Sequence, residues 1–350
     1  MKEIGFAIVG YGRIGRRHGS IIAGLPEAKL CALVDVDENV AEVDENVAKA
    51  EENVTGGPRM NAEGPAAVPV FQTLEALLES PVAAQISVVN ITSPNGFHAR
   101  QACTALEAGL HVVIEKPLAI SAADAQKVLD TAARSDRHVF AVMQNRYSPS
   151  ARWLRQLVGS GKLGRIFMVQ MDCYWNRDGR YYSPGSWHGT PELDGGTLFT
   201  QFSHWVDMLY WLFGDITRIQ SRMENFAHRG LTGFEDSGFV SFDFIGGGMG
   251  SLNFSTAVWG KNLESSMTII AEYGSVKIGG QYMERVEYCH GLDIPAPEGP
   301  ELFSVPGDPE AHHRDLLGNV IDVLKGRAVS DIDARDGLKV VEIIERIYKA

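Results

Sequence analysis

The sequence predicts an α/β fold, with an N-terminal Rossmann-type parallel sheet and a C-terminal α+β domain whose open sheet is mainly antiparallel. Two patterns support this prediction. Strand and helix patterns alternate over about the first 120 residues, as a doubly wound sheet requires, and alternating apolar stretches with glycine turns follow Arg146. At 350 residues the chain suits two domains. We expect them at 1–120 and 121–350, with the C-terminal helix packing back on the first.

A glycine-rich turn follows the first predicted strand, the apolar run Ile4–Val9. It opens an amphipathic helix, so strand, turn and helix occur in the order of the dinucleotide-binding fingerprint. Gly10 permits the turn, Gly12 lets backbone N–H groups approach a pyrophosphate, and Gly15 lets the helix pack close to the strand. The alternative is a purely structural turn. The candidate cofactor-binding residues here are Gly10, Tyr11, Gly12, Arg13, Ile14 and Gly15.

The second predicted strand, 30–34, ends at Asp35, which is about where a ribose-binding acid is expected after such a turn. A carboxylate there accepts hydrogen bonds from ribose hydroxyls and repels a 2′-phosphate. No arginine follows it, since the next residues are Val36 and Asp37. Asp35 therefore favours NAD over NADP, the alternative being a solvated acid at a strand end.

Composition excludes several classes of function. The net charge of −12 argues against nucleic-acid and anionic-membrane partners. The four cysteines are widely separated, which is typical of thiols in a reducing compartment rather than of disulfides or a zinc site. No run of about 18 apolar residues occurs. We expect a soluble cytoplasmic protein that acts on a small molecule.

The remaining patterns complete both domains. Residues 36–54 contain a seven-residue near-repeat that we interpret as an insertion in a surface element rather than a coiled coil. His312 and His313 are adjacent but have no cysteine or acid at ligand spacing, so we predict no metal site and a surface pair at a helix start. The other expected strands are 86–91, 111–114, 139–143, 166–174, 238–244, 250–254 and 267–271, and the other expected helices are 74–78, 99–108, 121–133 and the region from 312.

A lysine stands where ligands bind in open α/β sheets, at the carboxyl end of a buried strand. The strand 111–114 is followed by Glu115, Lys116 and Pro117. An ammonium group is costly to bury there unless it has a role, such as a hydrogen bond to a substrate hydroxyl. The alternative is a lysine that reaches the surface from a loop.

A second candidate group lies in 193–207, where Gly195 and Gly196 precede a predicted helix from Thr197. The two glycines would let the backbone approach another group closely. On one helix Thr200 and His204 lie four residues apart and share a face. His204 has a side chain suited to proton abstraction near neutral pH. The alternatives are a core histidine and, for Asp207, a structural acid.

These motifs together resemble the glucose–fructose oxidoreductase / inositol dehydrogenase family, over essentially the whole chain. The glycine turn, 115–117, the turn 94–98 and the segment from the two glycines to Asp207 occur in the family's order and spacing. The resemblance implies NAD(P)-dependent oxidation of a sugar or cyclitol carbon. It also implies Lys116 and His204 in the active site, and dimers or tetramers built through the open sheet face. Further cofactor-binding residues it implies are Thr92, Pro94, Asn95, His98, Glu115 and Lys116.

One departure from the family bears on the substrate. The family commonly has aspartate four residues before the catalytic histidine, where this chain has Thr200. Non-acidic residues there look like the branch that oxidises UDP-N-acetylglucosaminuronate at C3 in polysaccharide synthesis. That branch tends to have arginine in place of His188. The substrate-binding candidates are Asn145, Arg146, Trp175, Arg177, Tyr182, Trp187, His188, Gln201 and His204.

Among these candidates, Arg146 and Arg177 suit anionic groups, or are ordinary surface arginines. Trp175 and Trp187 suit stacking on uracil or a sugar, or are core aromatics.

The resulting hypothesis is hydride transfer from a ring carbinol to the nicotinamide of NAD. His204 accepts the hydroxyl proton, Lys116 hydrogen-bonds the oxygen, and Thr200 orients the hydroxyl or His204. The roles of His204 and Lys116 can be exchanged. The alternatives are a redox-neutral NAD-dependent epimerase, lyase or glycosidase, an inositol or free-sugar dehydrogenase, and a non-catalytic dinucleotide sensor.

Overall fold

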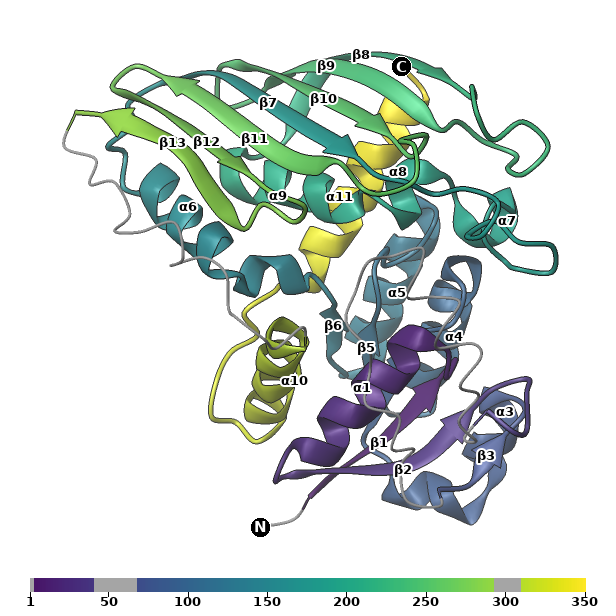
Figure 1. The fold of residues 1–350 in the computed structure, drawn as a ribbon. Helices are drawn as coiled ribbons and strands as arrows, with labels where there is room; N and C mark the ends of the chain where they lie inside the picture. Colours follow the sequence, from purple (N-terminus) through teal and green to yellow (C-terminus); the bar gives the residue numbers. More distant parts are fainter. Residues whose placement is uncertain (1–2, 41–67, 293–309) are drawn as a thin grey trace. The chain divides into compact units, whose positions relative to one another are not determined.

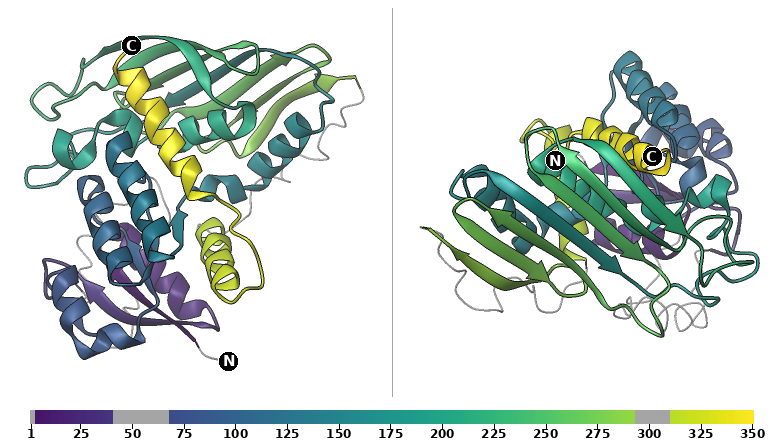
Figure 2. Two further views of the ribbon diagram at one scale, coloured as in Figure 1. Left: turned by 180° about the vertical axis from the view of Figure 1, so that it is seen from behind. Right: turned by 90° about the horizontal axis from the view of Figure 1, so that it is seen from above.

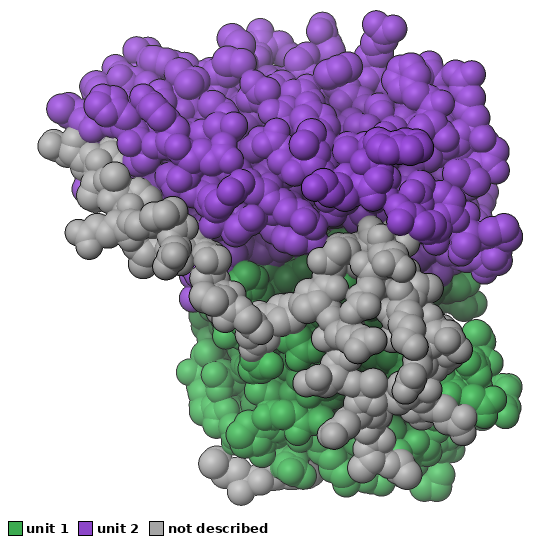
Figure 3. Space-filling model, in the orientation of Figure 1, with its two compact units in different colours: residues 1–52, 57–144, 309–341 green, residues 53–56, 145–308, 342–350 purple. Residues whose placement is uncertain are grey.

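A computed structural model describes residues 3–40, 68–292 and 310–350. It divides into two compact units, coloured in Figure 3. The first contains 1–52, 57–144 and 309–341, and the second contains 53–56, 145–308 and 342–350. The first unit extends past residue 120 because the strand at 139–141 pairs with the strand at 111–114. Most of the seven-residue near-repeat lies outside the described residues.

The sheet of the first unit has six parallel strands in the order β3-β2-β1-β4-β5-β6 (Figure 1). Its central strands are apolar and buried on both faces, as a parallel sheet covered by helices requires. This confirms the predicted doubly wound architecture. The strands are β1 (Ile4–Val9), β2 (Ala28–Val34), β3 (Val70–Phe71), β4 (Val88–Ile91), β5 (His111–Ile114) and β6 (Val139–Ala141).

The helices of the first unit form two groups. Helix α1 contacts α10, while α4 contacts both α3 and α5. Helix α10 therefore brings a late part of the sequence against the first helix of the chain. The helices are α1 (Arg13–Gly24), α3 (Leu74–Glu79), α4 (His98–Glu107), α5 (Ala122–Ser135) and α10 (Ala311–Leu324), with 3₁₀ turns η1 (Pro81–Gln85) and η2 (Asn95–Phe97).

The second unit is built on a seven-stranded mixed sheet in the order β13-β12-β11-β7-β10-β9-β8. Strands β7 and β10 pair in parallel, and the other neighbouring strands are antiparallel. The predicted, mainly antiparallel sheet is thereby confirmed. The strands are β7 (Ile166–Tyr174), β8 (Ile216–Glu224), β9 (Ser237–Phe244), β10 (Met249–Ser255), β11 (Glu264–Ala271), β12 (Gly274–Gly279) and β13 (Arg285–Gly291).

Within the part of the chain that the structure describes, one face of this sheet carries no helix, as the view from above in Figure 2 shows. Burial alternates along its strands, and side chains such as Phe239, Met249 and Ile270 are exposed. The helices of the second unit are α6 (Pro149–Gly159), α7 (Pro191–Asp194), α8 (Thr197–Thr200) and α9 (Ser203–Phe213), with η3 (Gln144–Tyr147) before them and α11 (Ala334–Tyr348) shared with the first unit. No helix within the described ranges is long and apolar enough to cross a membrane.

Candidate functional site

The glycine turn at the end of β1 has the geometry that a dinucleotide needs. Gly10 has φ of +84°, and a Cβ there would lie 2.6 Å from Ser93 Cα. A Cβ on Gly15 would lie 2.2 Å from the carbonyl oxygen of Gly10, so the helix packs directly against the turn. A Cβ on Gly12 would meet no described atom within 4 Å. The turn is therefore tight on its protein side and open above Gly12.

The start of α1 fits an anionic group. Its N-cap, Gly12, makes no side-chain cap, and the first turn holds no acid, so no capping side chain or acid of that turn competes with an anion for its N–H groups. Asp35 Oδ2 accepts the N–H of Tyr11 at 2.7 Å, which brings the predicted ribose-binding acid to the turn. Thr92 donates to the carbonyl of Gly10 at 2.6 Å. These residues fit the diphosphate and ribose of NAD.

His98, predicted to bind cofactor, is enclosed at the start of α4. Its side chain is buried, with Nδ1 2.8 Å from the carbonyl oxygen of Pro117 and Nε2 2.8 Å from that of Ser93. Burial lowers its pKa. Asn95, in η2 just before it, is also buried. His98 thus connects the turn after β4 to the turn after β5, where Lys116 lies.

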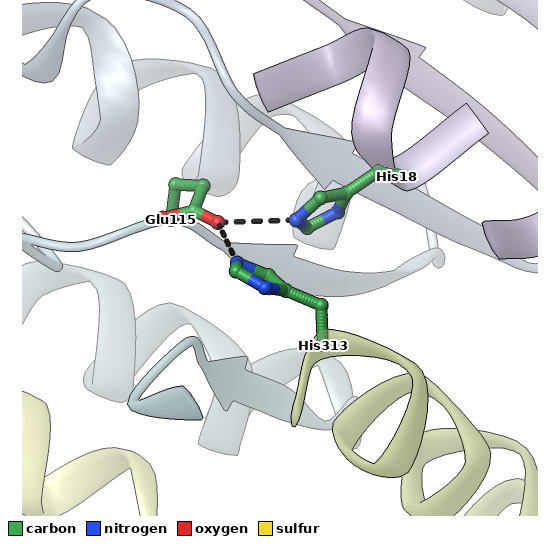
Figure 4. A group of neighbouring side chains, drawn as sticks. All are labelled: His18, Glu115 and His313. Carbon is green, nitrogen blue, oxygen red and sulfur yellow. Dashed lines mark hydrogen bonds and ion pairs between the residues drawn. The ribbon is translucent and has the colours of Figure 1, made fainter. Parts of the chain in front are cut away.

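Three buried side chains meet at the end of β5 (Figure 4). His18 Nε2, from α1, lies 3.0 Å from Glu115 Oε1, and His313 Nε2, from α10, lies 3.6 Å from the same oxygen. The other oxygen, Oε2, accepts the backbone N–H of Lys116 at 3.1 Å. The Lys116–Pro117 peptide bond is cis. The carboxylate is therefore connected directly to the backbone of the candidate catalytic lysine.

The charge state of this group follows from its contacts. Burial would raise the pKa of Glu115, but contacts with His18 and then His313 hold it well below the usual value. Burial lowers the pKa of His313 to about 4. At neutral pH a neutral His313 therefore faces an ionised Glu115, so this contact is not a salt bridge.

The ligand atoms of His18, Glu115 and His313 lie within 4.8 Å of one another, a spacing that a metal could use. Asn90 argues for a hydrogen-bonded group instead. Its Nδ2 lies 2.9 Å from His18 Nδ1, which makes Nδ1 the acceptor and leaves the ring hydrogen on Nε2, directed at Glu115. A metal needs a lone pair at that nitrogen.

The predicted surface pair at 312–313 is wrong for His313. Its side chain is buried, because it begins the apolar stripe of α10. The acid it faces comes from a distant part of the sequence, where no local spacing could reveal it. The sequence did contain a sign of this burial, because Leu316, Leu317 and Val320 follow His313 at helical spacing and form one apolar stripe with it.

The single helix predicted from Thr197 is also wrong. Helix α8 ends at Thr200 and α9 begins at Ser203; the backbone departs from the helical conformation at Phe202, with φ of −119° and ψ of 9°, while Gln201 keeps helical angles. His204 is buried in the first turn of α9. The hydroxyl of Thr200 lies against Asp194, 2.8 Å from its backbone oxygen and also in contact with Oδ1.

The close approach predicted at Gly195 and Gly196 is made by Tyr348. A Cβ on Gly196 would lie 2.5 Å from the Tyr348 hydroxyl. That hydroxyl accepts the N–H of Leu198 at 3.0 Å and donates to Glu235 Oε1 at 2.6 Å. Burial raises the pKa of Glu235 to about 7. A residue of α11 thus holds the start of α8.

Neither candidate arginine is an ordinary surface arginine, since both are buried. Arg146 makes a two-pronged contact with Asp207: Nε lies 2.9 Å from Oδ2, and Nη2 lies 2.5 Å from Oδ1. Asp207 is fully buried, one helical turn after His204. This contact agrees with Asp207 as a structural acid and uses Arg146 to neutralise it.

Arg177 is held among aromatic rings and amides. Its Nε donates to Gln201 Oε1 at 2.7 Å, and the guanidinium carbon lies 4.9 Å from the ring centre of Trp175 and 5.2 Å from that of Tyr181. Gln201 in turn donates to the Tyr181 hydroxyl at 2.7 Å. The sequence-predicted residues Trp175, Arg177 and Gln201 are therefore brought together.

The remaining predicted substrate residues lie nearby or in the core of the same unit. The ring of His188 lies 4.2 Å from Tyr181 and stacks on Trp187 at 4.0 Å. Tyr182 is buried against His228. Asn145 lines a small cavity together with Trp205 and Tyr282.

Comparison with known proteins assigns these features to a family. Residues 4–143 match the oxidoreductase family model with an NAD-binding Rossmann fold, and residues 151–277 match the GFO/IDH/MocA C-terminal domain. The chain belongs to the GFO/IDH/MocA family of oxidoreductases. Its first unit accordingly contains the family's NAD-binding fold.

Two solved structures match over nearly the whole chain. The WlbA dehydrogenase of Bordetella pertussis, in complex with NADH and UDP-GlcNAcA, is 29% identical with a TM-score of 0.84, covering 99% of this chain and 95% of that one. The enzyme of the same name from Chromobacterium violaceum, with the same ligands, is 30% identical with a TM-score of 0.82, covering 100% and 94%.

Curated relatives match over shorter stretches. Inositol 2-dehydrogenase of Salmonella typhimurium is 31% identical over 133 residues, which are 37% of this chain and 36% of that enzyme. The chain spans less than two thirds of the length of three such relatives.

Proposed function

We propose that this protein is an NAD-dependent dehydrogenase that oxidises a ring carbinol of a nucleotide-sugar, at C3 of UDP-N-acetylglucosaminuronate. The observation that supports this substrate most strongly is the full-length similarity to two dehydrogenases crystallised with NADH and UDP-GlcNAcA. Thr200 stands where the family commonly has an acid, but its hydroxyl contacts the carboxylate of Asp194, so the substitution alone does not argue for an anionic substrate.

Arg177 is the residue we propose for the anionic part of the substrate. Its guanidinium is fixed by Gln201 and by the carbonyl oxygen of Asn176, 2.6 Å from Nη1. A planar guanidinium held rigidly recognises a carboxylate or a diphosphate with little loss of side-chain entropy. The rings of Trp175 and Tyr181 beside it would exclude water and strengthen that interaction.

NAD, when bound, accepts the hydride at its nicotinamide ring. His204 accepts the proton of the hydroxyl being oxidised, and Lys116 donates a hydrogen bond to the oxygen as it becomes a ketone. The two roles can be exchanged. The start of α1, with Asp35 and the glycine turn, holds the diphosphate and adenosine ribose.

The first test is NADH absorbance with a panel of UDP-N-acetylglucosaminuronate, UDP-N-acetylglucosamine, myo-inositol and glucose. We expect NADH with the nucleotide uronate, and Lys116→Ala and His204→Ala each to lower kcat by about 10²-fold or more. Oxidation of free sugars or inositol alone would contradict the substrate. Bound NAD that is reduced and reoxidised within each turnover, without net NADH, would instead indicate redox-neutral chemistry.

Arg177→Lys tests the anion site. It keeps the charge but loses the planar fork, so we expect KM for the nucleotide uronate to rise while the affinity for NAD stays unchanged. The matched control is Arg180→Lys, because Arg180 is exposed and pairs with Asp178 at 2.7 Å. An equal rise in KM in both variants would argue against a specific role for Arg177.

A further inference from the structure

The backbone around Lys116 is held from both sides by buried histidines. Before it, Glu115 receives His18 and His313, and after it, the carbonyl oxygen of Pro117 faces His98. Two of these histidines come from the part of the sequence before Lys116. His313 comes from α10, almost two hundred residues later.

His313 is fixed independently of Glu115. It shares one face of α10 with Leu316, Leu317 and Val320, all buried. Just after the far end of the same helix, Lys325 and Arg327 both contact Glu27, which lies between α1 and β2. The position of the His313 ring is therefore set by the packing of α10 and does not depend on its contact with Glu115.

We propose that His313 is a positioning residue for Lys116. Its ring closes the side of Glu115 Oε1 that His18 leaves uncovered, and together the two rings fix the orientation of the carboxylate. The second oxygen of that carboxylate then fixes the backbone N–H of Lys116. This inference rests on the proposed function, in which the Lys116 ammonium must meet a substrate oxygen. A displacement of about 1 Å at such a group can cost about 10²-fold in rate.

The test compares His313→Leu, which removes the polar ring edge that lies 3.6 Å from Glu115 Oε1, with His313→Gln, which keeps a polar amide at that position. We expect His313→Leu to lower kcat by about 10–100-fold, with the KM for NAD close to wild type, and His313→Gln to recover most of the rate. Arg327→Leu is the control for docking of α10: it removes one of the two contacts with Glu27 and should lower the melting temperature. Because Lys325 and the buried stripe still hold the helix, we expect kcat to stay unchanged. If His313→Leu does not fold, His313→Asn, whose amide is too short, takes its place.

A second readout separates this inference from the proposed function. Acylation of Lys116 by an amine-reactive reagent, followed by peptide mass spectrometry, needs no substrate. We expect the acylation rate of Lys116 to change in His313→Leu and to return in His313→Gln. If the wild type oxidises nothing in the panel, the proposed function fails and the acylation rates still decide the role of His313.

Three results would overturn the inference. One is unchanged kcat and unchanged Lys116 acylation in His313→Leu. Another is a loss of kcat in His313→Leu that His313→Gln does not restore. The same holds if Arg327→Leu also loses kcat, and the losses in the two variants follow their decreases in melting temperature. The third is stoichiometric metal in the purified protein that His313→Leu abolishes, which would make the group a metal site.

Discussion

Each candidate catalytic residue has a buried carboxylate beside it, and the two carboxylates are stabilised in different ways. Glu115 precedes Lys116 and is held by two histidines and a backbone N–H. Asp207 lies one turn after His204 and is held by the guanidinium of Arg146. In the first case two histidine rings and a backbone N–H surround the anion, and in the second a full positive charge neutralises it.

This difference predicts different sensitivities. A charge pair fails when one partner is removed, because the other is left buried and uncompensated. A carboxylate held by histidines depends on the protonation state and the orientation of each ring. The Glu115 group should therefore respond to pH, while the Asp207 pair should respond mainly to substitution.

The largest expected effect is on the Asp207 pair. Arg146→Met leaves a fully buried carboxylate without its charge partner, so we expect a loss of about 3–5 kcal/mol in unfolding free energy. Tryptophan fluorescence in urea measures it, because all six tryptophans lie in the second unit. The matched control is Arg165→Met, which breaks an exposed pair with Glu272 and should leave the midpoint unchanged. Equal shifts of the urea midpoint in Arg146→Met and Arg165→Met would show that the buried pair is no more important for stability than the exposed one.

An intermediate effect concerns pH. The pKa of His313 is about 4 when folded and 6.5 ordinarily. Between these values the unfolded chain binds a proton that the folded ring does not, so the first unit loses stability as pH falls, by up to about 3 kcal/mol. The pKa of Glu235 is about 7 when folded and 4.5 ordinarily. The second unit therefore loses stability of similar size as pH rises from 4.5 to 7.

The two opposite dependences of stability on pH, one for each unit, can be measured separately. Tryptophan fluorescence follows the second unit, and hydrogen exchange of peptides from β4 and β5 follows the first. We expect His313→Leu to flatten the pH dependence of exchange, and Glu235→Gln to flatten that of the fluorescence transition. If each variant flattened the pH dependence of both hydrogen exchange and the fluorescence transition, the two units would respond to pH together and the predicted difference would be wrong.

The smallest expected effect concerns Tyr348, the counterpart of His313 in the second unit. Tyr348→Phe keeps the ring and removes a hydrogen bond to Glu235 and one from Leu198, at a cost of about 1–2 kcal/mol. We expect a lower fluorescence midpoint in the urea curves, and a pKa of Glu235 that rises further, because the carboxylate loses the donor that lowers its pKa. A midpoint equal to that of the wild type would show that the packing of the ring suffices.

The sequence predicted the features that depend on local patterns. The glycine turn, Asp35 and the parallel strands follow from spacing and apolar runs, and the structure places Asp35 at the glycine turn, where it accepts the N–H of Tyr11. The alternation of apolar residues likewise predicted the mainly antiparallel sheet. Local patterns suffice there because a helix or a half-buried strand buries one face, so its apolar residues recur at the period of that element.

The network around each candidate residue could not be predicted in this way. His313 and Glu115 are far apart in sequence, as are Tyr348 and Gly196, and no spacing rule connects them. The break between α8 and α9 falls at Phe202, whose side chain is buried against Trp175 and Phe254. The helical pattern of the segment from Thr197 contains no sign of it.

The positions of His313 and Tyr348 late in the sequence have a consequence for synthesis. The strand that ends before Lys116 and the helix that bears His204 leave the ribosome before the residues that hold them in place. Domains generally fold in the order in which they are made. For this chain, the order of translation and the order of assembly should therefore differ: both halves of the proposed catalytic machinery reach their final geometry only when α10 and α11 have been translated.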